Sequence, residues 1–87
     1  MNEKELEKIF KAVANRRRIL ILKYLKQKGA ATVGDIAEEI KLSFRSTSRH
    51  LSVLYSAELL DKRQASLNIF YFILKSRKEL INKLLSL

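Results

Sequence analysis

Two short amphipathic segments lie almost end to end in the middle of the chain, and their spacing limits the fold more than any other feature. The first, residues 32–41, begins at Thr32, whose hydroxyl can cap a helix with apolar residues at helical spacing. The second, residues 44–57, follows Ser43, another favoured N-cap residue. Only about three residues separate the helices, and the second one is basic, which predicts a helix-turn-helix.

The second of these helices has two unlike faces. Projected at about 100° per residue, Thr47, Leu51 and Leu54 share a packing face. The other side carries two arginines and small hydroxyl side chains, which suit guanine edges, phosphates and close approach to DNA. The residues predicted to contact DNA from the helix are Ser43, Phe44, Arg45, Ser46, Ser48, Arg49 and Ser52. An ordinary amphipathic surface helix has a similar pattern, so the rest of the chain must show whether this helix binds DNA.

The chain loses its helical period after residue 57. Leu59 and Leu60, and then residues 69–74, are rich in strand-forming residues and flank a polar, basic stretch. This pattern predicts a β-hairpin with a loop of about 3–5 residues. The residues expected to face the core are Phe70, Phe72 and Leu74, and those expected to face away are Ile69, Tyr71 and Ile73.

A basic hairpin after a helix-turn-helix is a wing. We expect this wing, residues 61–69, to contact the DNA backbone through Lys62, Arg63 and Gln64. Its tip lacks glycine, so Asn68 is the residue expected to take a positive φ. The predicted fold class is therefore mainly α-helical with a small β-hairpin, a winged helix-turn-helix.

Amphipathic helices also occupy both ends of the chain. The first is capped by Asn2, and the last is expected to run from a cap at Ser76 to about residue 86. The last helix has a broad apolar stripe, which can fold onto its own core or pair with a second copy across a two-fold axis. We favour pairing, which predicts a homodimer. The residues expected at the dimer interface are Leu6, Ile9, Phe10, Leu80, Ile81, Leu84 and Leu85.

Residues 15–28 form the expected central helix, because apolar residues surround much of its girth. Its first turn carries the arginine run 16–18, at the end where the helix dipole disfavours cations. Two explanations for these arginines remain open: phosphate contact, or a salt bridge to Glu58 or Asp61.

The composition narrows the function further. The 87 residues predict one domain, 1–87, and 18 Lys and Arg against 9 Asp and Glu give a net charge of +9, which favours a polyanionic partner. The absence of Cys predicts no disulfide, and the absence of a long apolar run predicts no membrane span. The basic residues are not gathered on one amphipathic helix, so we expect no membrane-surface binding. The polar start is unlike a signal peptide, so we expect a cytoplasmic protein. The serines near His50 lie on the same helix at spacings that do not converge, so we predict neither a catalytic site nor a cofactor.

The whole pattern resembles the ArsR family of winged-helix transcriptional repressors. The matching segments are IFKAVANRRRILILKYL at 9–25, the helix-turn-helix at 32–60 with SRHLSVL at 48–54, and the wing at 62–74. The resemblance implies a homodimer that represses transcription at an operator on double-stranded DNA. It also implies DNA contacts from the positions of Phe44, Arg45, Ser48 and Arg49.

The chain departs from the family at several positions. Phe44 replaces the usual Gln; it can touch a thymine methyl group or pack locally, and its place near the apolar face favours packing. The metal-binding cysteines are missing and His50 is the only histidine, so we expect no metal response, and any small-molecule effector is unknown. Lys41 and Glu58 stand where the family often has Gly, at an expected cost on the order of 1 kcal/mol each if the backbone is left-handed.

Two other functions remain as alternatives. A winged helix can bind another protein, which exposed apolar residues such as Phe44 and Val53 would favour and the basic residues oppose. The chain can also be a DNA-binding activator, antitoxin or architectural factor, because sequence does not distinguish these from a repressor.

Overall fold

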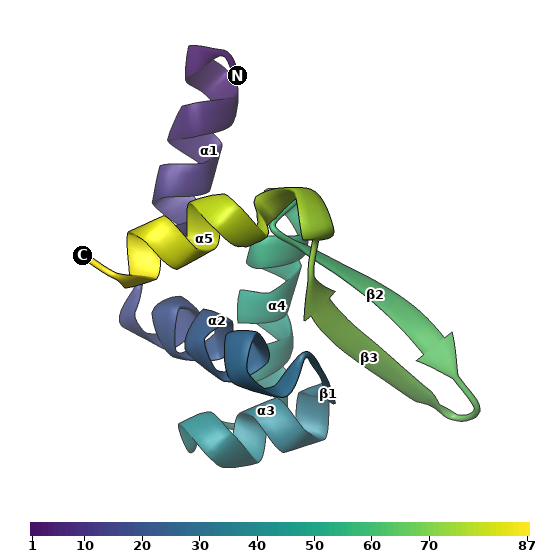
Figure 1. Cartoon of the computed structure of the whole chain (residues 1–87). Coiled ribbons are helices and arrows are strands. Elements are labelled where there is room, and N and C mark those ends of the chain that lie inside the picture. The colour runs from purple at the N-terminus through teal and green to yellow at the C-terminus, as the bar shows by residue number, and fades with distance from the viewer.

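In the computed structural model, five α-helices surround the core, and a hairpin extends from it as the wing (Figure 1). The helices are α1 (Glu3–Val13), α2 (Arg16–Lys28), α3 (Val33–Ile40), α4 (Phe44–Ser56) and α5 (Lys78–Leu85). The strands are β1 (Ala30–Thr32), β2 (Leu60–Ala65) and β3 (Asn68–Ile73), and a short 3₁₀ helix, η1 (Lys75–Arg77), precedes α5. The predicted winged helix-turn-helix is confirmed, with β1 as an addition.

Side-chain caps fix the starts of the first four helices. In each, a side-chain oxygen accepts a hydrogen bond of 2.9–3.2 Å from the backbone N–H three residues later. The capping residues are Asn2, Asn15, Thr32 and Ser43, as predicted. The predicted cap at Ser76 is wrong, because that residue lies within η1 and α5 begins at Lys78 without a side-chain cap.

Helix α2 lies at the centre of the core, because its apolar side chains point in several directions. Ile21, Leu22 and Leu25 are buried, and every other α-helix, β1 and β3 contact α2. Ile36 of α3 and Leu51 of α4 belong to the same core cluster. Burial of a side chain of this size contributes about 1.5–3 kcal/mol, so packing against α2 holds the helix-turn-helix in place.

The sheet joins the wing to the helices through its middle strand. The strand order is β1-β3-β2, and both pairings are antiparallel. Ala31 of β1 and Lys62 of β2 flank Tyr71 of β3 in register. Strand β1 has only three residues and no alternating pattern, so sequence analysis missed it. Because β1 follows α2 directly, it attaches the base of the hairpin to the central helix.

The face of β3 that turns inward is the opposite of the predicted one. Tyr71 and Ile73 are buried. The residues that are only half-buried are Phe70, Phe72 and Leu74. Alternation shows which side chains share a face, but both faces of this strand are apolar, so it does not show which face is inward. The buried Ala31 beside Tyr71 marks the inner face, and that neighbour comes from a distant part of the chain.

The hairpin turn is also tighter than predicted. Strand β2 ends at Ala65 and β3 begins at Asn68, so two residues form the turn. Ser66 has φ 59°, so the positive φ falls on Ser66 and not on Asn68. A two-residue hairpin turn commonly needs positive φ because its twist must match that of the strands, and here a serine adopts it.

Lys41 and Glu58 both adopt the left-handed conformation that the family's glycines favour, with φ 55° and 58°. Lys41 ends α3, and the following residue, Leu42, donates its N–H to the Ala37 carbonyl at 3.1 Å. The Cβ atom of each residue is strained there by about 1 kcal/mol. The turn geometry is thus kept without glycine, at a cost in stability.

Replacing Lys41 with Gly should therefore raise the free energy of unfolding by up to about 1 kcal/mol, because it removes this strain. The change can be measured by urea unfolding at fixed protein concentration. As a control, Lys26→Gly within α2 should lower stability by about 1 kcal/mol, because glycine disfavours a helix interior. Equal losses in both variants would contradict the strain at Lys41.

Candidate nucleic-acid interface

Hydrogen bonds hold the α3–α4 turn against the core. The guanidinium of Arg17, on α2, donates to the Ile40 carbonyl at 3.3 Å and so satisfies the end of α3. Ser43 then caps α4 by accepting from the Ser46 N–H at 3.1 Å. The turn, the cap and the buried face of α4 together fix the direction in which α4 presents its exposed side.

Helix α4 has the two faces expected from its sequence. Thr47, Leu51 and Leu54 are fully buried, and Arg45 and Arg49 are exposed. Four serines also belong to the predicted DNA-contact set. Ser43 and Ser52 are exposed, and Ser46 and Ser48 are half-buried. We call the exposed side, defined by Arg45, Arg49 and Ser52, the reading face.

Phe44 does not pack locally. Its residue surface is 63% exposed, although it is the first residue of α4 and lies near the edge of the apolar face. The expectation that Phe44 packs is therefore wrong. The helical projection placed it close to the apolar stripe, but at the first turn of the helix no element covers that side.

Arg18 forms no salt bridge to Glu58 or Asp61, and phosphate contact by the arginine run stays a prediction. Its Nε donates to the Ala12 carbonyl at 2.6 Å, and its Nη2 donates to the Lys11 carbonyl at 3.3 Å. Its Nη1 lies 3.2 Å from Nδ1 of His50 on α4. One guanidinium thus satisfies carbonyls at the end of α1 and contacts α4. The sequence shows that the arginine run at the start of α2 is unusual, but it does not show which groups these arginines contact, because those groups are distant in sequence.

His50 is half-buried against this arginine. Because a guanidinium only donates hydrogen bonds, Nδ1 of His50 accepts, and the neutral ring carries its proton on Nε2. Burial lowers the pKa of His50 below its ordinary value, and the positive charges of Arg18 and Arg17 lower it further. His50 is therefore a neutral link between α4 and α2, which sequence analysis missed.

Aromatic rings support the base of the wing. The ammonium group of Lys62 lies 4.7 Å from the ring centre of Tyr55, at the end of α4, and 5.8 Å from that of Tyr71. The guanidinium of Arg63 lies 5.9 Å from the ring centre of Phe72 on the same hairpin. Lys62, Arg63 and Gln64 are all exposed. The basic wing residues are therefore positioned beside the end of α4.

No acidic side chain neutralises the cations of this surface. The only ion pairs in the protomer are the exposed Lys11–Glu7 and Lys83–Glu79 pairs, which lie within α1 and α5. Arg45, Arg49 and the wing cations have no acidic partner. An unpaired positive surface of this kind attracts a polyanion.

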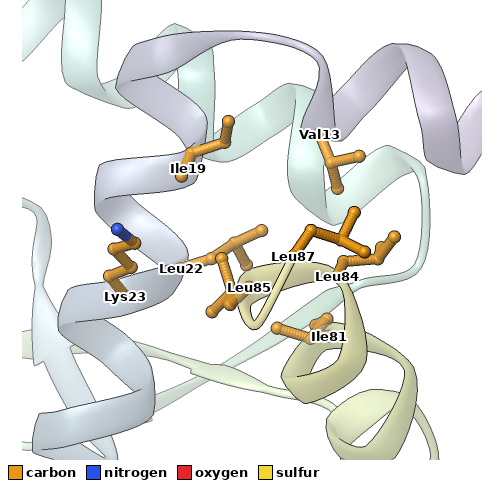
Figure 2. A pocket seen from close by; sticks show the side chains of 8 residues that line it. All are labelled: Val13, Ile19, Leu22, Lys23, Ile81, Leu84, Leu85 and Leu87. Carbon is orange, nitrogen blue, oxygen red and sulfur yellow. The ribbon is translucent and has the colours of Figure 1, made fainter.

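A second feature of the surface is an apolar hollow between α2 and α5 (Figure 2). Its volume is about 320 Å³. The residues that line it are Val13, Ile19, Leu22, Lys23, Ile81, Leu84, Leu85 and Leu87. Seven of these eight are apolar, and Leu87 is fully exposed, so the hollow is open to solvent and able to receive apolar side chains.

Not all residues predicted for the dimer interface are accessible. Ile9 and Ile81 are buried in the protomer's own core, so they have no surface to give to a partner and the prediction is corrected for these two. The half-buried members of the set are Leu6, Leu80, Leu84 and Leu85. Phe10 is 51% exposed, next to the buried Ile9 in the second half of α1.

No group of three or more His, Cys, Asp or Glu side chains converges as a metal site requires. No helix is both long and apolar enough to cross a membrane. The features that remain are a helix-turn-helix with a basic exposed side and a basic wing, which define a winged helix-turn-helix DNA-binding protein.

Comparison with known families agrees with this class. The model described as bacterial regulatory protein, arsR family, matches residues 15–62, more than half of the chain. The chain belongs to the ArsR family of DNA-binding transcriptional regulators, which is not a family of enzymes.

Individual relatives extend the likeness over most of the chain. An uncharacterized HTH-type transcriptional regulator, MJ1325 of Methanocaldococcus jannaschii, is 36% identical over 76 residues, covering 87% of this chain and 85% of the relative. The transcriptional repressor SdpR of Bacillus subtilis is 38% identical over 66 residues, covering 76% and 72%. The homodimeric winged helix-turn-helix domain of Mb0332 from Mycobacterium bovis superposes with a TM-score of 0.81 at 29% identity, covering 95% and 73%.

Lowering the pH from about 7.5 to about 5.5 should reduce the free energy of unfolding through His50. The unfolded chain binds a proton there near the ordinary pKa of 6.5, whereas the folded chain binds it only at lower pH. The stability that is present above pH 6.5 is thus lost as the pH falls towards the lowered folded value. Urea unfolding at both pH values tests this.

The matched variant is His50→Gln, which does not titrate and whose carbonyl oxygen can still accept from Arg18. Its stability should depend less on pH than that of the wild type over the same interval. An identical pH dependence in the two proteins would show that His50 does not carry the effect.

Proposed function

We propose that the protein is a homodimeric repressor that binds an operator with α4 in the major groove and the wing on the DNA backbone. The observation that carries the proposal is the reading face, where Arg45 and Arg49 stand exposed and unpaired on a helix fixed by its buried side. Exposed arginines on the recognition helix suit guanine edges, and the wing cations suit phosphates. The DNA contacts predicted for α4 and for the wing are part of this proposal.

The repressor role rests on the relatives. SdpR, at 38% identity, is a transcriptional repressor. A DNA-binding domain of this size represses most simply by occupying an operator that overlaps a promoter, since no further activity is needed. Activation at other promoters is the alternative outcome, and a reporter assay on the selected operator distinguishes the two by the sign of the change.

The homodimer rests on the apolar hollow and on the Mb0332 domain, which is homodimeric. The hollow offers a second copy an apolar surface that a single chain leaves in water. A two-fold dimer would place two copies of α4 about 34 Å apart, which matches half-sites one helical turn apart.

The first experiment measures the mass of the protein by light scattering and then selects its operator from random duplexes at two salt concentrations. A dimer that enriches a palindrome, with affinity falling steeply as salt rises, supports the proposal. A monomer that ignores duplex DNA at low salt favours protein contact instead. The observations that favour that alternative are the exposed Phe44 and Val53 on α4.

Arg45→Ala and Arg49→Ala should each weaken binding to the selected operator by roughly 1–3 kcal/mol and relax base preference, because they remove base contacts. Lys62→Ala and Arg63→Ala should weaken binding to all sequences alike and reduce the salt slope by about 1 each. Fluorescence anisotropy on operator and random DNA measures both effects. Lys28→Ala, which removes the same charge away from the reading face, is the control.

Leu84→Asp should shift the protein towards monomer, because it places a charge in the apolar hollow. The lost burial is worth about 1.5–3 kcal/mol for each of the two copies. Light scattering over a range of protein concentrations measures the shift. Asn82→Asp, at an exposed position of the same helix, should leave the mass unchanged. Equal masses for both variants would place the dimer interface elsewhere.

A further inference from the structure

Phe44 is an exposed aromatic residue at the start of the helix proposed to enter DNA. With 63% of its surface in water, it is more exposed than the other apolar residues of α4. It makes no cation–π contact, in contrast to the aromatic residues at the base of the wing. Ser43, directly before it, caps the helix and fixes the backbone from which the ring projects. The backbone that carries the ring is thus fixed, and most of the surface of Phe44 is open to a partner.

Its place in the helix indicates what the ring can meet. The N-terminal residues of a recognition helix are the ones that contact base edges in the major groove. The major groove is polar except for the 5-methyl group of thymine, which is its one apolar group. An exposed phenyl ring at this position therefore has one favourable contact among the four bases.

We propose that Phe44 reads the 5-methyl group of a thymine in each half-site of the operator. This inference rests on the proposed function and adds a base preference to it. Arg45 follows Phe44 directly and turns about 100° away around the helix, so it meets a different base edge. The half-site should then combine a thymine at the Phe44 position with a guanine read by arginine.

The test replaces each thymine of the selected operator, one at a time, with deoxyuridine, which lacks only the methyl group. For the wild-type protein, one position in each half-site should bind about fourfold more weakly, as expected for loss of one buried methyl group, and the others should not change. In Phe44→Ala that position should lose its thymine preference. Phe44→Leu, which keeps an apolar side chain, should retain part of it.

Val53→Ala is the matched control, because Val53 is an exposed apolar residue of the same helix, about 13 Å further along its axis. It should keep the full preference for thymine. Phe44→Gln should instead shift the preference at the same position to adenine, because an amide can bond both adenine N6 and N7. Thermal unfolding of each variant should match the wild type, since the ring is exposed.

The outcomes separate the inference from the function beneath it. An operator that is bound tightly but tolerates deoxyuridine everywhere overturns the role of Phe44 and leaves the DNA-binding proposal intact. So does a Phe44→Ala variant that still prefers thymine at the same position. A protein that selects no duplex sequence overturns both proposals.

Discussion

The structure depends on the packing of the other elements against the apolar side chains of one helix, α2. A chain of 87 residues has material for only one core, and Ile21, Leu22 and Leu25 are its centre. The other helices and two of the strands reach that core by contacting α2, so their mutual orientation follows from the same burial. The exposed side of α4 and the base of the hairpin are positioned by this packing. The positions of the exposed side chains on α4 and the hairpin therefore depend on how the core packs.

Much of the fold could be predicted because its determinants are local. Asn15 and Ser43 cap the helices that follow them within three residues, and the buried face of α4 follows from helical spacing alone. The inward face of β3 could not be predicted, because it is set by Ala31, which lies far from Tyr71 in sequence. Strand β1 was missed for the same reason: a strand of three residues is defined by its partner and not by its own pattern.

Some residues of the candidate site could likewise be predicted from the sequence, and others could not. Arg45 and Arg49 were recognisable from charge and helical position, and the structure leaves both exposed. Phe44 was misjudged, because a helical projection does not show that neighbouring elements end before the first turn. The Arg18–His50 contact was missed because it joins two residues that are 32 positions apart in the sequence. The sequence shows which residue types are present, but it does not show which distant residues come into contact.

The hairpin is anchored at one end only. Leu60, Tyr71 and Ile73 are buried at its base, whereas residues 62–69 are exposed and extend beyond the helices (Figure 1). A two-stranded ribbon without an apolar layer beneath it is marginally stable on its own. The wing is therefore held by the core at its base and only by the pairing of β2 with β3 towards its tip. If the wing contacts DNA as proposed, its unsupported tip can adjust to grooves of different width, and the contact then costs conformational entropy.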